Sequence, residues 1–127
     1  ANSKPDVAVT AVESSLAALD VARENAQSLD INNVRLLRSD WFSALQGERF
    51  DLIVSNPPYI ADADVHLTQG DLRFEPSQAL SSGADGLDDI RTIIAEAGNY
   101  LAPGGWLMLE HGYNQAASVC TLLQQVG

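Results

Sequence analysis

The sequence predicts an α/β fold built from parallel strands with helices on both faces of the sheet. Two observations predict this fold class. Short apolar runs rich in β-branched residues alternate along the chain with segments whose apolar residues recur at helical spacing. Most connections between them are short, and such strand–helix–strand alternation places the strands parallel. The 127 residues, 46% of them hydrophobic, are sufficient for one globular domain.

The first predicted strand is the continuous apolar run 7–12, which is typical of a strand buried on both faces. Glu13 follows at its carboxyl end. Ser14 and Ser15 are candidate N-caps for a helix that runs from residue 16 to about residue 29. The apolar face expected for this helix consists of Leu19, Ala22, Ala26 and Leu29.

The next segments predict two further strands. Residues 34–38 form the second strand. A short helical turn over 43–46 follows and stops at Gly47, because glycine tolerates the left-handed backbone common at helix ends. The third strand covers 52–55, at the end of an apolar run rich in β-branched residues.

The middle of the chain contains a long connection and a helix. The stretch 60–82 lacks clean periodicity, and loops of this length are usually functional, so we expect a lid or binding loop. A helix is predicted over 87–101, with Asp88 and Asp89 placed favourably at its N-terminus. Its apolar face is expected to hold Ile90, Ile93, Ile94 and Ala97.

The last part of the chain predicts a turn, a strand and a helix. The turn is Pro103-Gly104-Gly105, the fourth strand covers 106–110, and the helix covers 113–126. Cys120 is the only cysteine, and its apolar pattern predicts a packed thiol rather than a nucleophile. The inward face predicted for this helix consists of Ala117, Cys120 and either Leu122 or Leu123.

Charge and hydropathy exclude several classes of protein. With 17 acidic and 7 basic residues the net charge is −10, so the surface would repel nucleic-acid phosphates. We expect a protein or small-molecule partner and no direct nucleic-acid partner. No apolar run is long enough to span a membrane, and the first residues lack a signal-peptide core. Together with the lone cysteine, these features predict a cytoplasmic protein without a membrane partner.

The most informative motif is Asn56-Pro57-Pro58-Tyr59, directly after the third strand. The prolines hold Asn56 extended and leave the carbonyl of Pro57 free. The Asn56 side-chain oxygen and this carbonyl would be two acceptors for the two donors of a planar NH2 group, and Tyr59 offers a face for stacking. A plain tight turn is the alternative interpretation. The position at a strand's carboxyl end, where open α/β sheets bind ligands, favours a binding site.

Polar residues also follow the first two strands. Glu13 can accept hydrogen bonds from both hydroxyls of a ribose, Trp41 can cover an adenine face, and Asp40 can accept from its exocyclic amine. The alternatives are a solvated charge at a helix N-terminus for Glu13, core burial for Trp41 and a cap for Asp40. Because the carboxyl ends of parallel strands meet at one edge, these residues and Asn56 are expected to line one crevice. We therefore predict a nucleoside-bearing cofactor facing an NH2-bearing substrate.

These motifs resemble the class I S-adenosylmethionine-dependent methyltransferases, which have a Rossmann-like sheet, and within them the release factor protein-(glutamine-N5) methyltransferases. Asn-Pro-Pro-Tyr alone is shared with methyltransferases that act on exocyclic amines of DNA and RNA bases. Residues 73–76 and 109–112 single out the release factor branch. The resemblance covers essentially the whole chain through Ala11-Val12-Glu13, Asp40-Trp41-Phe42, Val54 to Ile60, Arg73-Phe74-Glu75-Pro76 and Pro103 to Gly112.

The resemblance implies a reaction. The substrate would be the glutamine of a Gly-Gly-Gln motif in a peptide chain release factor, and the cofactor would be S-adenosyl-L-methionine. Asn56, Pro57 and Tyr59 would be the catalytic residues, because they orient the amide nitrogen toward the sulfonium methyl. No metal, covalent enzyme intermediate or strong general base is required. His66 and His111 are expected to be loop or structural residues.

The resemblance also implies which residues bind each reactant. The cofactor-binding residues would be Glu13, Asp40, Trp41 and Asn56. The substrate-binding residues would be Asn56, Pro57, Pro58 and Tyr59, together with Arg73, Phe74 and Glu75 in a loop that closes over the glutamine.

Two departures from the family's pattern stand out. The family usually has Asp at the position of Glu13, whose longer side chain can still reach a ribose. The family's Gly-rich cofactor loop, its N-terminal helical domain and its last strands have no counterpart within 1–127. We therefore expect a partial methyltransferase domain, truncated at both ends, with weakened cofactor binding.

Three alternative functions have distinguishing features. A nucleic-acid exocyclic-amine methyltransferase shares the Asn-Pro-Pro-Tyr motif, but it should carry a basic surface. A non-catalytic module could keep the fold for partner binding, but it should show a decayed motif. An NAD-dependent enzyme could use an acidic residue after its first strand, but it has no use for Asn-Pro-Pro-Tyr.

Overall fold

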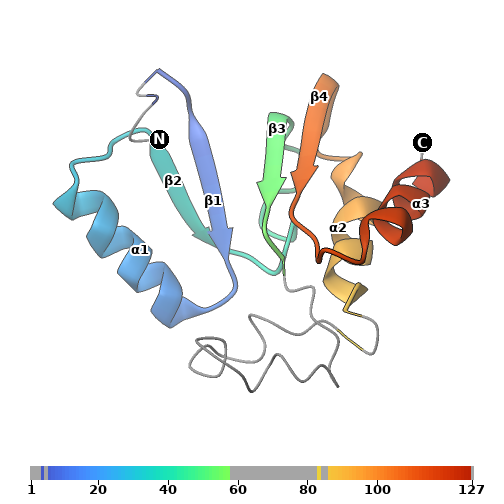
Figure 1. The fold of residues 1–127 in the computed structure, drawn as a ribbon. Helices are drawn as coiled ribbons and strands as arrows, with labels where there is room; N and C mark the ends of the chain where they lie inside the picture. Colours follow the sequence, from blue (N-terminus) through green and yellow to red (C-terminus); the bar gives the residue numbers. More distant parts are fainter. Residues whose placement is uncertain (1–3, 5, 58–82, 84–85, 127) are drawn as a thin grey trace. The chain divides into compact units, whose positions relative to one another are not determined.

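The computed structural model describes residues 4, 6–57, 83 and 86–126. The chain divides into two compact units, Ala1–Glu48 and Arg49–Gly127. In each unit two parallel strands are connected through a helix, and the second unit has one helix more (Figure 1). The described part of the chain is therefore α/β with parallel strands, which confirms the predicted fold class.

The first unit contains β1 (Val9–Glu13), α1 (Leu16–Ser28) and β2 (Val34–Arg38). The two strands pair in parallel from Val9 opposite Val34 to Glu13 opposite Arg38. Helix α1 runs beside this pair, and its Leu19 side chain is 1% exposed (Figure 1). Ser15 is the N-cap, because its hydroxyl accepts a hydrogen bond from the Ala18 N–H at 3.3 Å.

Two expectations for this unit were wrong in detail. The first strand starts at Val9 rather than at residue 7, because the Asn33 amide donates to the carbonyls of Lys4 and Val7 at 2.8 and 2.6 Å. These bonds hold the preceding residues in a turn instead of a ladder. Leu29, predicted on the apolar face of α1, is the C-cap and is 61% exposed.

The connection after β2 is a series of turns rather than the predicted helical turn over 43–46. Turns cover residues 41–44 and 46–47, and Gly47 has a φ of +82°, which is a conformation glycine adopts without strain. Phe42 and Leu45 are 7% and 5% exposed, so they anchor this connection in the core of the unit.

The second unit contains β3 (Phe50–Ser55), α2 (Asp88–Ala97), β4 (Leu101–Leu109) and α3 (Ala116–Val126). Both helices lie on the same side of the parallel β3–β4 pair (Figure 1). The predicted apolar face of α2 is confirmed, since all four of its residues are buried. The core cluster consists of Leu87, Ile90, Ile94 and Val119, with Leu107, Leu109 and Leu122 packed against it.

Helix α2 is shorter and β4 longer than predicted. The helix ends at Ala97, and Leu101 begins the strand, where the preceding Tyr100 carbonyl accepts from the Phe50 N–H at 2.8 Å. The predicted turn at 103–105 lies inside β4, because the pairing shifts from Phe50 opposite Leu101 to Leu52 opposite Trp106. The turn residues therefore form an irregularity within the strand.

The inward face of α3 was predicted correctly for Leu122 and wrongly for Ala117 and Cys120. Val119 is buried and Leu122 packs against the core cluster, whereas Ala117 and Cys120 are exposed and Leu123 is 39% exposed. The helix also begins at Ala116 rather than at residue 113. Each residue turns a helix by about 100°, so an error of one position moves a side chain from the core to the surface.

Among the described residues, no helix has the length and apolar character needed to cross a membrane. The same residues contain no group of three or more His, Cys, Asp or Glu side chains arranged to hold a metal ion.

Candidate active site

The carboxyl ends of β1 and β2 bring the predicted cofactor residues together. Glu13 is the last residue of β1 and stands opposite Arg38, the last residue of β2. The ladder continues for one more bond, in which the Ser39 N–H donates to the Glu13 carbonyl at 3.1 Å. Asp40 and Trp41 follow directly, so the prediction that they share one sheet edge with Glu13 is confirmed.

Glu13 is half-buried, and one of its two carboxylate oxygens is already hydrogen-bonded within the protein. Its Oε1 accepts a hydrogen bond from the Ser15 N–H at 3.1 Å, at the start of α1. The other oxygen accepts no hydrogen bond from any described residue. The helix-terminal role considered from the sequence is therefore real, and it leaves one oxygen for a ligand hydroxyl.

Asp40 lies in the turn through its backbone. Its N–H donates to the Ser43 hydroxyl at 3.1 Å, and its carbonyl accepts from the Ser43 N–H at 3.1 Å. Its exposed carboxylate takes no part in these bonds, so a side-chain cap, the alternative interpretation of Asp40, is not observed. The carboxylate is free to accept a hydrogen bond from a ligand amine.

Trp41 is half-buried and has a φ of 52°, a left-handed backbone that bulky residues rarely adopt. The buried aromatic residue of this segment is its neighbour Phe42. Full core burial, the alternative interpretation of Trp41, is therefore not observed.

Ser39 is a residue of this edge that the sequence reasoning missed. It is 6% exposed, and its hydroxyl donates to the Trp41 carbonyl at 2.7 Å. Serine before a turn often bonds the backbone two residues on, so the Ser-Asp-Trp order carried a usable signal. Arg38 was missed as well, since its Nε donates to the Ser14 carbonyl at 3.3 Å across the same edge.

Asn56 and Pro57 follow β3 in the second unit. Asn56 is exposed and Pro57 is buried. The Ser55 carbonyl accepts from the Glu110 N–H at 3.0 Å, so the ladder with β4 holds the residue immediately before Asn56. No described residue donates to the Asn56 side chain or to the Pro57 carbonyl, so both predicted acceptors are available.

Five predicted substrate-binding residues lie outside the described residues: Pro58, Tyr59, Arg73, Phe74 and Glu75. The expected loop over 60–82 and His66 also lie there. The predicted meeting of Asn56 with Glu13 and Trp41 joins residues of the two units, and it stays a prediction.

The segment after β4 is held by local hydrogen bonds. His111 Nδ1 lies 2.8 Å from the Gly112 carbonyl oxygen, and the Gly112 N–H donates to the Gln115 side chain at 2.7 Å. Gln115 is 8% exposed and stands directly before α3, and its carbonyl accepts from the Val119 N–H. His111 thus has the structural surroundings that the sequence led us to expect.

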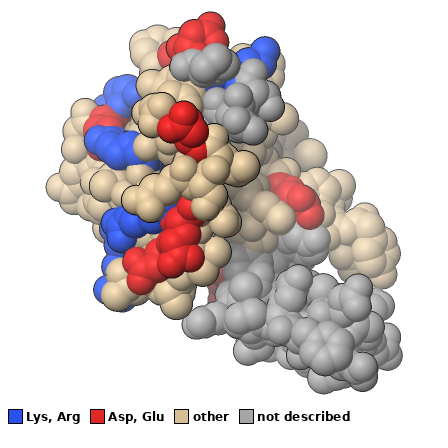
Figure 2. Space-filling view, turned by 90° about the vertical axis from the view of Figure 1, so that its left-hand side faces the viewer, with Lys and Arg blue, Asp and Glu red and all other residues tan. Residues whose placement is uncertain are grey.

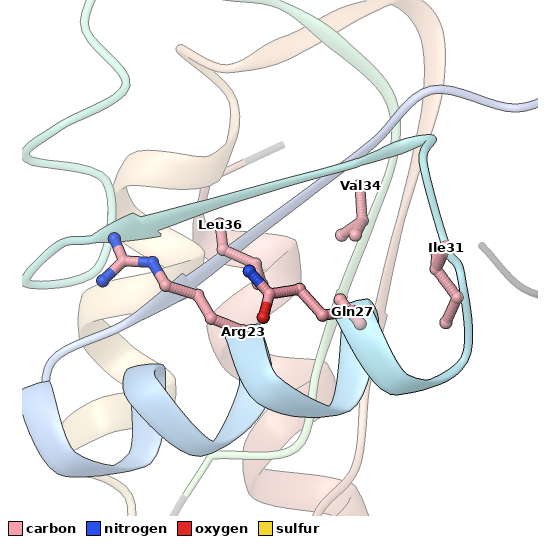
Figure 3. A pocket seen from close by; sticks show the side chains of 6 residues that line it. Arg23, Gln27, Ile31, Val34 and Leu36 are labelled. Carbon is pink, nitrogen blue, oxygen red and sulfur yellow. The ribbon is translucent and has the colours of Figure 1, made fainter.

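A hollow of about 270 Å³ lies on the first unit between α1 and β2 (Figure 3). Its strand residues are Val34 and Leu36, the first and third residues of β2, so it lies away from the carboxyl end of that strand. The helix contributes Arg23, Ala26 and Gln27, and Ile31 completes the lining. None of these residues was predicted to bind a ligand.

Comparison with known proteins decides the family. Residues 1–83 of the 127 match the family model described as the methyltransferase small domain. The chain belongs to this family. The methyltransferase small domain thus covers β1, α1, β2 and β3 together with every described residue of the predicted site.

The methyltransferase domain is also similar to curated release factor glutamine methyltransferases. It is 57% identical to the one from Xylella fastidiosa over 98% of this chain, and 54% identical to the one from Pseudomonas aeruginosa over 97%. Against the Escherichia coli protein the identity is 50% over 94% of this chain. The chain spans less than half the length of these relatives, 45%, 45% and 43% in the same order.

Proposed function

We propose that this chain supplies the cofactor-binding and catalytic strands of a protein methyltransferase. The enzyme would transfer a methyl group from S-adenosylmethionine to the side-chain amide nitrogen of a release factor glutamine, in a Gly-Gly-Gln motif. The observation that carries the proposal is the identity of 50–57% with release factor glutamine methyltransferases over 94–98% of this chain. Release factors act in the cytoplasm, so we place the reaction there.

Asn56 and Pro57 are the residues proposed to bind the amide. A primary amide is a poor nucleophile, because its nitrogen lone pair is delocalised into the carbonyl. Two acceptors that hold its N–H groups fix the plane of the amide and direct the nitrogen at the reacting carbon. The same acceptors stabilise the positive charge that develops on nitrogen during transfer. The exposed Asn56 side chain and the Pro57 carbonyl, to which no described residue donates, suit this role.

The edge formed by β1 and β2 suits the nucleoside part of the methyl donor. Glu13 retains one carboxylate oxygen for a ribose hydroxyl, Asp40 presents an exposed carboxylate to an amine, and Trp41 presents part of its ring. S-adenosylmethionine, when bound, would supply the electrophilic methyl group on its sulfonium. We propose that these three residues, with Asn56, hold it.

Further contacts to the substrate are proposed for residues outside the described part of the chain. Tyr59 would pack against the amide plane after Pro58. A loop carrying three residues would close over the glutamine: Arg73, Phe74 and Glu75.

A second candidate is methylation of an exocyclic amine of a nucleic-acid base, which the Asn-Pro-Pro-Tyr motif favours. The net charge of −10 counts against it. On the face in view in Figure 2, Lys and Arg lie among Asp and Glu rather than in one continuous basic patch. Phosphate binding would require such a patch.

The test uses the full-length gene product and S-adenosylmethionine labelled with tritium in the methyl group. A release factor, the same factor with its motif glutamine changed to alanine, and double-stranded DNA are offered in parallel. We expect label on the unaltered release factor alone. Label on DNA would favour the second candidate, and label on neither substrate would contradict the proposal.

A further inference from the structure

The segment after β2 is organised around one buried hydroxyl group. Ser39 is 6% exposed, and its Oγ donates to the Trp41 carbonyl at 2.7 Å and accepts from the Ala44 N–H at 3.0 Å. The Ser43 hydroxyl lies 3.3 Å away as a third partner. A serine hydroxyl has one donor and two acceptor sites, so these three contacts use its full hydrogen-bonding capacity.

The residue held by this hydroxyl has a strained backbone. Trp41 has a φ of 52°, in the left-handed region where a Cβ crowds the following carbonyl. Such conformations persist only where the surroundings over-determine them, and they cluster at ligand sites. The Ser39 hydroxyl bonds the carbonyl of the strained residue itself, so it opposes relaxation to an ordinary conformation.

Ser39 also ties this segment to β1. Its N–H donates to the Glu13 carbonyl at 3.1 Å. The hydroxyl and the N–H of one residue therefore set the position of Trp41 relative to Glu13, the two residues proposed to hold adenine and ribose. Phe42, the next residue, is 7% exposed, whereas Trp41 is half-buried.

We infer that Ser39 is a positioning residue for the methyl donor. Its hydroxyl holds the backbone of Trp41 so that the indole is available to the adenine ring. This inference rests on the proposed function. It adds a residue that makes no contact with the reacting atoms and acts through Trp41.

The test is a double-mutant cycle in the full-length gene product, with S-adenosylmethionine affinity measured by calorimetry. Ser39→Ala is expected to weaken binding about tenfold, the effect of losing one buried hydrogen bond. Trp41→Ala is expected to weaken binding by about tenfold or more, as the loss of base stacking does. The double variant should bind like Trp41→Ala, because Ser39 acts through the indole. Ser28→Ala, the same change on the exposed end of α1, is the control and should bind normally.

A second readout reports on the indole without the cofactor. In protein labelled with fluorotryptophan, the Trp41 resonance is the fluorine signal that Trp41→Phe removes. Ser39→Ala should shift or broaden this signal, and Ser43→Ala, which removes the other hydroxyl of the turn, should move it less. An unchanged resonance in both variants would overturn the inference, whether or not the protein binds S-adenosylmethionine.

The outcomes separate this inference from the proposed function. If the unaltered protein binds S-adenosylmethionine and Ser39→Ala binds it equally well, only the inference fails. The inference would also be overturned if Ser39→Ala weakened S-adenosylmethionine binding by the same factor in the unaltered protein and in Trp41→Ala. Such a result would show that Ser39 has a general structural role. If the unaltered full-length protein does not bind S-adenosylmethionine, the proposed function itself fails.

Discussion

Trp41 and Phe42 are adjacent aromatic residues with opposite surroundings. Phe42 is 7% exposed, whereas Trp41 is half-buried and has a left-handed backbone. Because both side chains are aromatic, the sequence alone does not show which of the two is buried. The hydrogen bond from Ser39 to the Trp41 carbonyl distinguishes them, because it fixes the backbone that carries the indole.

Asn56 can be tested with a single substitution. Asn56→Ala is expected to lower methyl transfer by about a hundredfold or more, because the amide loses an acceptor that orients it. S-adenosylmethionine affinity should fall much less than the rate of transfer, because Glu13, Asp40 and Trp41 still hold the methyl donor. Transfer of the tritium label and calorimetry on the full-length gene product measure the two effects. Asn99→Ala removes another exposed asparagine side chain and is the control. Normal turnover by Asn56→Ala would contradict the assigned role.

The exposure of Cys120 leads to a chemical prediction. Cys120 is an exposed free thiol, so it should react with a maleimide reagent in the native protein without denaturant. In a Cys120→Ser background, Val119→Cys places the thiol one residue earlier, at a position that is 4% exposed. That thiol should react only on unfolding. Mass spectrometry locates the label, and equal native reactivity at both positions would contradict the observed face of α3.

At the scale of elements, hydrogen bonds outside the ladders decide where the strands begin. The Asn33 amide captures the Val7 carbonyl, which delays the start of β1. The Tyr100 carbonyl accepts from Phe50, so β4 begins before the glycines rather than after them. Each strand still ends within one residue of its predicted end. The site-bearing ends of the strands are therefore the ends that the sequence predicts best.

Gly105 allows a test of the irregularity inside β4. A Cβ at this position would lie 2.9 Å from the Ala102 carbonyl oxygen and 3.1 Å from those of Asp51 and Phe50. Because these are backbone atoms, Gly105→Ala should lower the free energy of unfolding by about 1–3 kcal/mol.

Gly98, after α2, is the matched control for that change. A Cβ there would meet nothing within 4 Å, and its φ is −58°. Gly98→Ala should therefore change the stability by less than about 1 kcal/mol, with a gain expected from the restricted unfolded chain. Urea unfolding of both variants gives the comparison, and an equal loss in both would count against the close approach at Gly105.

At the scale of the whole molecule, the β3–β4 pair has one covered and one open face. Leu107 and Leu109 pack against the core cluster. The other face carries two cross-strand pairs, Leu52 with Trp106 and Val54 with Met108. These four side chains are 51%, 73%, 67% and 56% exposed in that order. Apolar side chains grouped in this way favour association and bind apolar dyes.

The open face yields a prediction for the 127-residue chain expressed alone. The native chain should enhance the fluorescence of the dye ANS, because the dye binds exposed apolar surface. The double variant Val54→Thr, Met108→Gln keeps similar shapes and should bind markedly less dye. A similar pair of changes on α3, Val126→Thr with Leu123→Gln, is the control and should have a smaller effect. Identical dye binding by both double variants would contradict a dominant role for the sheet face.

Most of the fold was predictable from periodicity, and the exceptions have local causes. Each of the four strands and three helices among the described residues overlaps a segment that apolar period and turn residues predicted, although several of their bounds differ. The face of α2 was correct because four apolar residues mark it without ambiguity. The face of α3 was wrong because that helix is apolar on several sides, so periodicity could not choose between Val119 and Cys120.

The candidate site was predictable in part for the same reason. Glu13, Asp40, Trp41 and Asn56 were predicted as site residues because each stands at or just after the end of a strand, and strand ends can be read from the chain. Ser39 was missed because a serine directly after a strand is also typical of an ordinary turn. Its importance depends on three hydrogen bonds that no spacing rule shows.

The sequence by itself determined the order of the elements, the parallel direction of the strands and the residues that stand at their carboxyl ends. These properties follow from local periodicity and from the short reach of the connections. Only the tertiary structure decided which side chains are buried, which carboxylate oxygen of Glu13 is already bonded, and that Trp41 is held out of the core. Burial depends on side chains distant in the chain, whereas Glu13 and Trp41 are held by hydrogen bonds to residues two positions away. Neither kind of contact leaves a periodic trace in the sequence.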